Sequence, residues 1–402
     1  MLHSVFSGQS AELALLEGTR ELSDGARRTA GQEHLAHALE IISSWTGYRA
    51  TPIVALGGAA RQFNVGEFLI KTEAERFGIG SFKALGPPYA LARAICELLR
   101  KRHHQPTENA VFCGRFREQL RDVTVAAASS GNHGRALAWA AQRIGCNCVI
   151  LMPAHTGKDR EANIQALGAT VIRVHGGYDD ALIAAQDESL KQQWLLVADV
   201  PLPEYPDISR DSIRGYAVIG IEIARQLADR LPSHVFVSAG SGCMAAGIAA
   251  GLAFELGGKR PSLVVVEPRS ADALLRSAHQ RRRVPALGDL STVMDGLAVR
   301  WPSERAWEIL ETTATAILTI PDEAAIITLR ALAKREYGDA PIEIGETGVA
   351  APAGALLAAA DVNLRSQLGI GPTSHILALA CEGVTDQGIF YALVNGATHM
   401  PK

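Results

Sequence analysis

The sequence predicts an α/β protein with open, mostly parallel, twisted sheets and flanking helices. Short β-rich runs alternate with Ala-rich stretches whose apolar residues recur at helical spacing. The 402 residues allow about two or three domains. Hydrophobic residues at 48% against charged residues at 20% are a globular balance, which excludes a disordered chain.

Seven runs are predicted as strands because they are short, apolar and bounded by turn residues. In chain order they are Thr124–Ala127, Cys148–Met152, Thr170–Val174, Leu195–Ala198, His234–Ser238, Leu263–Glu267 and His375–Ala380. Helical spacing predicts helices between them at Gly134–Ile144, Arg160–Leu167 and Met244–Leu256. The polar, turn-rich segment 101–122 is predicted to be a surface insertion.

Composition and charge limit the classes of partner and the cellular compartment that we expect. Lys and Arg number 39 against 42 for Asp and Glu, so the net charge of −3 gives no electrostatic footprint for nucleic acid or an acidic membrane. We therefore expect small molecules or a second copy of the chain as partners. Six scattered cysteines without metal-ligand spacing predict a reducing, cytoplasmic location and no metal site.

Two segments bear on targeting and membrane insertion. The N-terminal residues lack a basic region followed by a continuous apolar run, so we expect no signal peptide. The uncharged stretch Val235–Phe254 has the length of a membrane span. Because it is interrupted by Gly240, Ser241 and Gly242, a soluble strand–loop–helix unit is the better prediction.

The first of three glycine-bearing sites follows the predicted strand His234–Ser238. Its loop, Gly240-Ser241-Gly242-Cys243-Met244, leads into a helix, whose N-terminal N–H groups suit a phosphate. Together with Glu267 the loop also satisfies a loose dinucleotide fingerprint. It equally suits a cofactor with one phosphate, and a turn without any ligand stays open.

The second site is Ala128-Ser129-Ser130-Gly131-Asn132-His133-Gly134, again between a strand and a helix. Successive small residues at a helix N-terminus form a nest for a carboxylate, built from amides and hydroxyls. Asn132 suits a hydrogen bond to a ring hydroxyl or an imine. The alternative is a plain N-cap in which Ser or Asn is the capping side chain.

The third site is Gly78-Ile79-Gly80-Ser81-Phe82-Lys83, where Ser81 is placed to cap a helix whose first turn holds Lys83. A lone lysine is usually a solvated surface residue. Lys83, however, lies in a segment without other charges that runs to Arg93. Burial there would make its amine a better nucleophile for imine formation.

Five ordered motifs resemble the fold-type II pyridoxal-phosphate enzymes, the relatives of tryptophan synthase β and threonine dehydratase. They are SFK, SSGNHG, AGSGCMAAG, Glu346 in GETG, and Cys381-Glu382-Gly383. Further segments resemble the diaminopropionate ammonia-lyase family: GYRATP at 47–52, ERFG at 75–78, GNHGR at 131–135, VMDGLA at 293–298 and EGVTD at 382–386. The resemblance runs from about Tyr48 to the end of the chain.

The resemblance implies a two-domain enzyme and assigns roles to the three sites. The cofactor domain would comprise residues 1–91 and 218–402, the substrate domain residues 92–217, and the enzyme would be a homodimer. Lys83 would hold pyridoxal phosphate as an imine, Asn132 would bind its ring hydroxyl, and the loop Gly240–Met244 would bind its phosphate. Ser129, Ser130, Gly131 and His133 would receive the substrate carboxylate.

Two further residues decide the reaction that the resemblance implies. Cys381 falls where this fold places a neutral residue beside the pyridine nitrogen, which favours expelling a β-leaving group over racemisation or transamination. Asp199 matches the base that the lyases use for the L-isomer. The implied reaction is elimination of ammonia from 2,3-diaminopropionate. For Asp199 a loop-start Asx-turn before Pro201 is an equally weighted alternative.

Two departures from the lyase pattern affect substrate choice. The family has an Asp immediately before GNHG, used for the D-isomer, whereas this chain has Ser130. Asp295 likewise replaces a small residue, as in dehydratases. We therefore predict that the D-isomer is a poor substrate. The alternatives are a serine/threonine-type dehydratase, a nicotinamide-dependent dehydrogenase that would need Glu267 on a ribose, and a catalytically inactive cofactor-binding protein.

Overall fold

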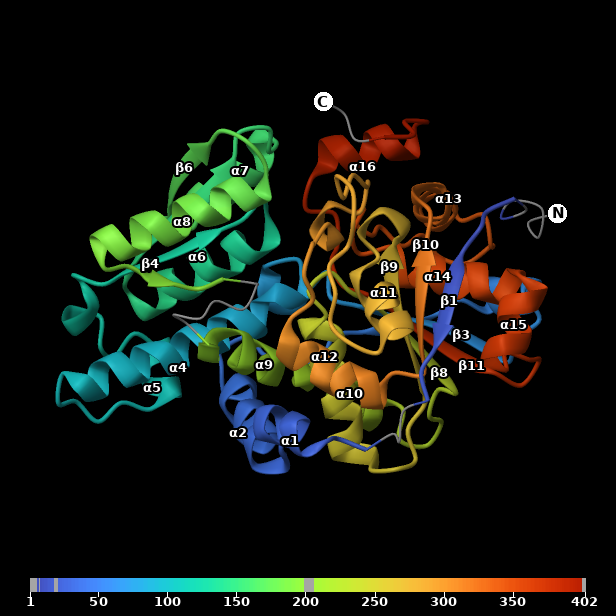
Figure 1. Ribbon diagram of the computed structural model, residues 1–402, viewed down its shortest axis with the longest axis horizontal. Coiled ribbons are helices and arrows are strands. Elements are labelled where there is room, and N and C mark those ends of the chain that lie inside the picture. Colours follow the sequence, from blue (N-terminus) through green and yellow to red (C-terminus); the bar gives the residue numbers. More distant parts are fainter. Residues whose placement is uncertain (1–5, 7, 18–20, 199–205, 400–402) are drawn as a thin grey trace. The chain divides into compact units, whose positions relative to one another are not determined.

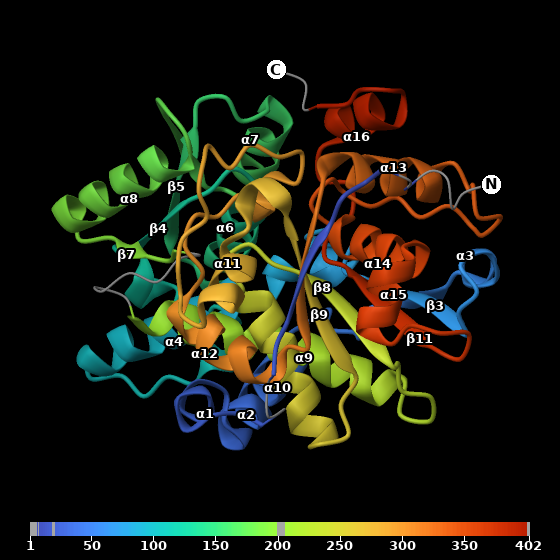
Figure 2. The same cartoon turned by 45° about the vertical axis from the view of Figure 1, so that its right-hand side comes forward.

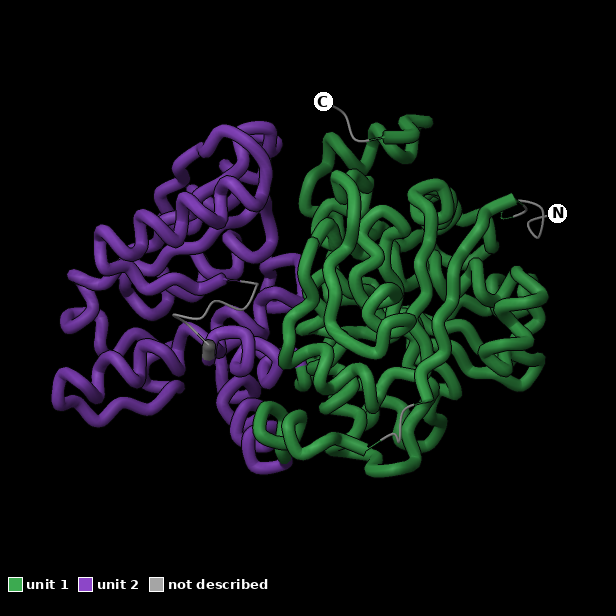
Figure 3. Tube along the Cα trace, in the orientation of Figure 1, with its two compact units in different colours: residues 1–31, 50–75, 217–401 green, residues 32–49, 76–216, 402 purple. Residues whose placement is uncertain are grey.

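All seven predicted strands are present in the computed structural model, which describes residues 6, 8–17, 21–198 and 206–399. The described residues form two compact units, shown in Figure 3. Unit 1 takes its residues from 1–31, 50–75 and 217–401, and unit 2 takes its residues from 32–49 and 76–216. Helix α9, Pro206–Gln226, contributes residues to both.

Unit 1 is built on a seven-stranded sheet with the strand order β1-β10-β9-β8-β11-β3-β2 (Figures 1 and 2). The strands are β1 (Glu12–Leu15), β2 (Ile53–Ala55), β3 (Glu67–Thr72), β8 (His234–Ser238), β9 (Ser262–Pro268), β10 (Ala316–Ile320) and β11 (His375–Ala380). The five inner strands are parallel, and the two edge strands β1 and β2 pair antiparallel with their neighbours.

Helices pack on this sheet and complete unit 1. Helix α14 contacts β8, β9, β10 and β11, and its Gly354 lies against Val266, where a side chain would not fit. The helices of unit 1 are α1 (Asp24–Ala30), α3 (Gly57–Gln62), α10 (Cys243–Leu256), α11 (Ala273–Gln280), α12 (Glu304–Thr313), α13 (Asp322–Ala333), α14 (Ala350–Ala360), α15 (Val362–Leu368) and α16 (Gln387–Val394), with 3-10 turns η5 (Arg269–Ala271) and η6 (Asp295–Leu297).

Unit 2 contains a four-stranded parallel sheet with the order β6-β5-β4-β7. Its strands are β4 (Thr124–Ala128), β5 (Asn147–Pro153), β6 (Thr170–Val174) and β7 (Leu195–Leu196). Its helices are α2 (Gln32–Ser43), α4 (Gly86–Lys101), α5 (Glu108–Phe112), α6 (Asn132–Ile144), α7 (Lys158–Gln165) and α8 (Tyr178–Gln192), with 3-10 turns η2 (Arg76–Gly78), η3 (Phe82–Ala84) and η4 (Glu118–Leu120).

Alternating residues of β5 show how this second sheet is covered. Val149 and Leu151 belong to an apolar cluster with Ala181 and Ala185 of α8. Ile150 instead contacts Gly134 of α6, where an added Cβ would lie 3.1 Å from Ile150 Cγ2. Because successive strand residues point to opposite faces, α8 and α6 cover opposite faces of the sheet.

The predicted surface insertion at 101–122 is wrong in part. Val111, Phe112 and Leu120 are fully buried, and the Phe112 ring stacks on Trp45 with their centroids 3.8 Å apart. Trp139 of α6 also packs edge-on against Phe112. The segment therefore supplies part of an aromatic core in unit 2, although its average composition is polar.

Unit 2 takes in residues 32–49 and 76–91, which lie outside the substrate domain predicted as 92–217. One reason is the packing just described, since Trp45 stacks within this unit. The predicted domains are defined by which ligand each would bind, whereas the two units are defined by the contacts within each. The units therefore do not test the predicted boundaries. Those boundaries stay a prediction.

The stretch Val235–Phe254 forms strand β8, the glycine loop and most of helix α10, as predicted. Among the described residues no helix combines the length and apolarity needed to cross a membrane. All six cysteines are free thiols. The described part of the chain also holds no cluster of His, Cys, Asp and Glu side chains suited to a metal ion.

Candidate active site

Lys83 lies in the 3-10 turn η3 of unit 2, which packs against helix α6. Its ammonium lies 5.1 Å from the centroid of the Phe82 ring. The Phe82 ring in turn packs against Tyr216 of α9, at a centroid distance of 5.0 Å. Gly86, at the start of α4, also lies against the Tyr216 ring, because an added Cβ would come within 2.4 Å of it. These contacts fix the backbone that carries Lys83.

Ser81 stands at the N-cap of this turn, as predicted, but its hydroxyl makes no capping hydrogen bond. The side chain is fully buried, and within the described residues its Oγ has no hydrogen-bond partner. Phe77, five residues upstream of Phe82, adopts a left-handed backbone with φ of 50°. Its ring packs on Trp139 and Trp45, which holds that conformation in place.

The second predicted loop begins helix α6, also in unit 2. The Ser129 hydroxyl accepts hydrogen bonds from the backbone N–H groups of Gly131 and Gly134, at 3.0 and 2.9 Å. The N-cap of α6 is Gly131, and no N-cap side chain bonds the helix, so the predicted capping by Ser or Asn is wrong. Ser129, two residues earlier, instead accepts from the third amide of the helix, and the Gly131 amide is used inside the loop. The Ser130 carbonyl accepts from Arg160 Nη1 at 3.4 Å.

Asn132 and His133 occupy the first turn of α6. The His133 imidazole is buried, and its Nε2 lies 2.7 Å from the Val197 carbonyl. Since a carbonyl only accepts, Nε2 donates in this bond. Asn132 is half-buried at the first helical position. Arg135, one turn further, is half-buried, and burial lowers the pKa of its guanidinium.

The first predicted glycine site is the loop that joins β8 to α10 in unit 1 (Figure 1). Gly242 is the N-cap of α10 with φ of 84°, a conformation that favours glycine, and no side chain caps this helix. The Ser241 carbonyl accepts from the Ser303 amide at 2.8 Å. A Cβ at Gly240 would lie 3.0 Å from Val299 Cγ2 and 3.2 Å from Leu297 Cα.

A chain of contacts extends from this loop across the carboxyl ends of the unit 1 strands. Gly240 lies against Gly296, whose amide donates to Thr347 Oγ1 at 3.0 Å. The amides of Thr347 and Gly348 donate to one carboxylate oxygen of Glu382, at 3.1 and 3.2 Å. These contacts join the segments 240–244, 293–299, 344–348 and 381–383.

Cys381 directly follows β11 and is buried beside Ser238, the last residue of β8. The Ser238 hydroxyl donates to Cys381 Sγ at 3.6 Å. Sequence reasoning assigned no role to Ser238 or Thr347. The only sequence signal for Ser238 is its position two residues ahead of the glycine loop.

The Glu267 carboxylate bonds the start of helix α11. It accepts hydrogen bonds from the amides of Leu274 and Leu275. The side chain is completely buried, and burial raises its pKa to about 8. A ribose could not reach this carboxylate, so the dehydrogenase interpretation loses the residue on which it depends.

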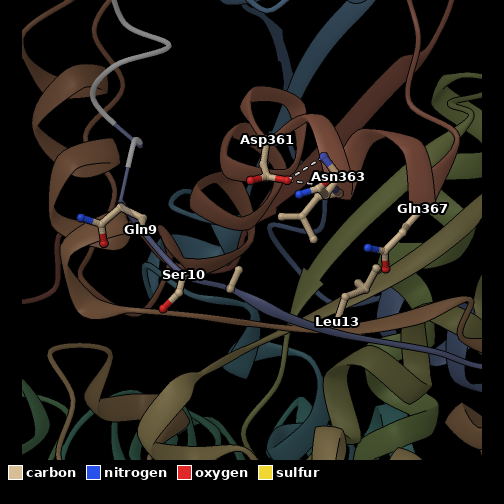
Figure 4. A pocket seen from close by; sticks show the side chains of 8 residues that line it. Gln9, Ser10, Leu13, Asp361, Asn363 and Gln367 are labelled. Carbon is tan, nitrogen blue, oxygen red and sulfur yellow. Dashed lines mark hydrogen bonds between the residues drawn. The ribbon is translucent and has the colours of Figure 1, made fainter.

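The predicted site residues thus fall into two groups. Unit 2 carries Lys83, Ser129, Ser130, Gly131, Asn132 and His133, and unit 1 carries Gly240, Ser241, Gly242, Cys243, Met244 and Cys381. Asp199 lies outside the described residues. A separate cavity of about 300 Å³ lies between the Gln9–Leu13 segment and α15, and no predicted site residue lines it (Figure 4).

Comparisons with known proteins agree with these motifs. A family model described as pyridoxal-phosphate dependent enzyme matches residues 45–382. The diaminopropionate ammonia-lyase of Escherichia coli is 34% identical over 351 residues, which cover 85% of this chain and 86% of that protein. Threonine dehydratase 1 of Solanum lycopersicum is 33% identical over 218 residues, covering 53% of this chain and 33% of that protein.

Solved structures extend the likeness over nearly the whole chain. Two structures of the Escherichia coli lyase, with an aminoacrylate-PLP azomethine intermediate and with D-serine, have TM-scores of 0.86 and 0.87. Both are 29% identical, and they cover 98% and 97% of this chain and 99% and 98% of their own.

The residues of the chain fit pyridoxal phosphate. The uncapped N-terminus of α10 presents amide groups suited to a phosphate, and the space above Gly240 is too narrow for a side chain. Lys83 supplies a primary amine on a turn held by Tyr216, and Cys381 supplies a neutral group at a strand end. The chain belongs to the pyridoxal-phosphate-dependent enzymes and, within them, to the diaminopropionate ammonia-lyases.

Proposed function

We propose that this enzyme eliminates ammonia from 2,3-diaminopropionate, with preference for the L-isomer, and releases pyruvate and a second ammonia. The observation that carries the proposal is the match to the Escherichia coli lyase, which extends over 98% of this chain and includes a structure with an aminoacrylate intermediate. In sequence, the match to the threonine dehydratase covers 53% of the chain, against 85% for the lyase, so a dehydratase is not favoured.

When bound, pyridoxal phosphate would act as a sink for the electrons released when the Cα proton leaves. Lys83 would supply the amine that anchors it and that the substrate amine displaces. The amides of Gly240, Ser241, Gly242, Cys243 and Met244 would bind the phosphate, and Asn132 would donate to the ring hydroxyl. Cys381 would stand beside the ring nitrogen as a neutral partner.

The substrate carboxylate would bind at the start of α6. Since both acceptor positions of the Ser129 hydroxyl are taken by Gly131 and Gly134, its remaining proton is left to donate to the carboxylate. Ser130, Gly131 and His133 would complete this part of the site. Gly131 would shape the loop, because its amide already donates to Ser129. His133 would contribute through its backbone, because its imidazole bonds Val197.

Asp199 is the proposed base for the Cα proton of the L-isomer. Ammonia leaves readily only when its nitrogen is protonated, and a carboxylate near both Cα and the β-amine can accept the first proton and return one to the leaving amine. Ser130, in place of an Asp, removes the carboxylate that the D-isomer would need. We therefore expect weak or no turnover of D-diaminopropionate.

We infer further that the cofactor domain comprises residues 1–91 and 218–402 and the substrate domain residues 92–217. We also infer a homodimer and a cytoplasmic location. The family resemblance supports the dimer and the domains, and the six free thiols support a reducing compartment. Sedimentation of the holoenzyme would test the dimer.

The reaction is tested by measuring products from purified enzyme with pyridoxal phosphate. L-2,3-Diaminopropionate should give two ammonia for each pyruvate, at a higher kcat/KM than L-serine or L-threonine. A hydroxy amino acid as the preferred substrate, with one ammonia for each keto acid, would instead identify a dehydratase. The D-isomer, assayed in parallel, tests the stereochemical preference.

A further inference from the structure

Two buried polar side chains meet at the carboxyl ends of neighbouring strands in unit 1. Strands β8 and β11 run parallel and side by side, and they end at Ser238 and immediately before Cys381. The exposed fractions of the two residues are 0% and 1%. The Ser238 hydroxyl donates a hydrogen bond to Cys381 Sγ at 3.6 Å.

This hydrogen bond restricts the thiol. A thiol has one weak S–H donor and rotates about its Cβ–Sγ bond, so it needs a second contact to hold a single direction. With the Ser238 hydroxyl on one side of the sulfur, the S–H bond points away from Ser238. Ser238 also lies two residues ahead of the loop Gly240–Met244. The same short segment therefore contacts the sulfur and leads into the proposed phosphate loop.

We propose that Ser238 is a positioning residue that orients the Cys381 thiol toward the pyridine nitrogen of the cofactor. The proposal rests on the role given to Cys381 under the proposed function. It assigns Ser238 no contact with the substrate or with the cofactor. Ser238 acts on the cofactor only by orienting the Cys381 sulfur. A serine that only filled a buried site would have no such effect.

A double-mutant cycle on the holoenzyme tests the proposal, using Ser238→Ala, Cys381→Ala and the double variant. The readouts are the absorption and fluorescence bands of bound pyridoxal phosphate, which respond to the surroundings of the ring, and the Kd of the cofactor. We expect each single variant to shift the bands in the same way and to raise the Kd about 2- to 10-fold, as loss of one hydrogen bond implies. In the double variant the band shift and the rise in Kd should be no larger than in the more strongly affected single variant.

Two comparison variants make the result specific. Cys381→Ser keeps a neutral donor that Ser238 can still bind, so it should retain the wild-type bands. Ser277→Ala removes another fully buried serine of unit 1, whose hydroxyl bonds the Ala273 and Val284 carbonyls, and should leave the bands and the Kd unchanged. Thermal melting of all variants checks that they fold.

Unchanged bands in Ser238→Ala, or effects of the two single variants that add, would overturn the proposal. Unchanged bands in Cys381→Ala would also overturn it, because the thiol would then not face the ring. The cycle needs only cofactor bound at Lys83 and no turnover. Failure to release pyruvate from diaminopropionate would therefore contradict the proposed reaction while leaving the result on Ser238 intact.

Discussion

The hydroxyl of Ser129 accepts a hydrogen bond from the backbone N–H of Gly134 at 2.9 Å, which ties the proposed carboxylate loop to the third position of helix α6. A second bond, from the Gly131 amide, closes the loop on itself. The shape of this part of the site therefore depends on one buried side chain. It does not depend on a bound substrate.

Replacing Ser129 tests whether its hydroxyl holds the shape of the loop as well as contacting the substrate. Ser129→Ala removes the acceptor of the Gly131 and Gly134 amides, which should cost about 1 kcal/mol in the free energy of unfolding. It should also raise KM for the amino acid, because the loop loses its internal acceptor. Thermal melting and steady-state kinetics measure the two effects. Ser130→Ala keeps the Ser129 acceptor, so an equal fall in its melting temperature would contradict this account.

Lys83→Ala should abolish borohydride trapping of the cofactor on the chain and lower kcat by about 10³-fold or more. Peptide mapping after reduction locates the trapped lysine in the wild-type enzyme. Lys101→Ala, an exposed lysine at the end of α4, is the matched control and should behave as wild type. Elimination at the wild-type rate by Lys83→Ala would refute the assignment.

Gly240→Ala places a methyl group against Val299 and Leu297, at 3.0 and 3.2 Å before relaxation. Overpacking of this kind typically costs about 1–3 kcal/mol. We expect part of this cost to appear as weaker cofactor binding, by about 10-fold, because the loop must shift. Fluorescence titration of the apoenzyme measures the Kd. Gly258→Ala, where an added Cβ meets nothing within 4 Å, should leave it unchanged.

Glu267→Gln should remove a pH dependence of stability. Burial raises the folded-state pKa of Glu267 to about 8, well above its ordinary value of 4.5. The folded protein therefore holds this proton more tightly than the unfolded chain. The stabilisation is fully present below pH 4.5 and is lost as the pH rises toward 8.

Glutamine carries no charge and keeps an acceptor oxygen for Leu274 and Leu275, since one carboxylate oxygen already accepts from both. The melting temperature of Glu267→Gln relative to wild type should rise from pH 5 to about pH 8 and level off above it. Calorimetry across this range measures it. Glu343→Gln, at an exposed position, should track wild type at every pH.

Strands β8, β9 and β11, in the middle of the unit 1 sheet, are predictable from local sequence because each is a short apolar run before a turn. Two other inner strands, β3 and β10, and the edge strands β1 and β2 are not among the seven predicted runs. Residues 12–15 form β1 only because β10, some 300 positions later, offers an edge for pairing. Likewise the burial of Phe112 depends on Trp45 and Trp139, and no local average of composition contains that information.

The same distinction applies to the candidate site. Lys83, Asn132 and the loop Gly240–Met244 are recognisable because each lies in a local motif between a strand and a helix. The bond from Ser238 to Cys381 joins residues 143 positions apart, so only the pairing of β8 with β11 reveals it. The use of Glu267 as a cap for α11, in place of a ribose ligand, is likewise a tertiary fact.

Ser130→Asp should add turnover of D-diaminopropionate. The substitution restores a carboxylate at the position that the lyase family uses for the D-isomer, where a general base typically contributes about 10²-fold or more. The Ser130 carbonyl accepts from Arg160, and the exchange leaves this backbone contact in place. Pyruvate release from each isomer gives the two kcat/KM values. Ser130→Asn, of the same size but without a base, should remain specific for the L-isomer. Equal D-isomer rates in the Asp and Asn variants would show that position 130 does not supply the base.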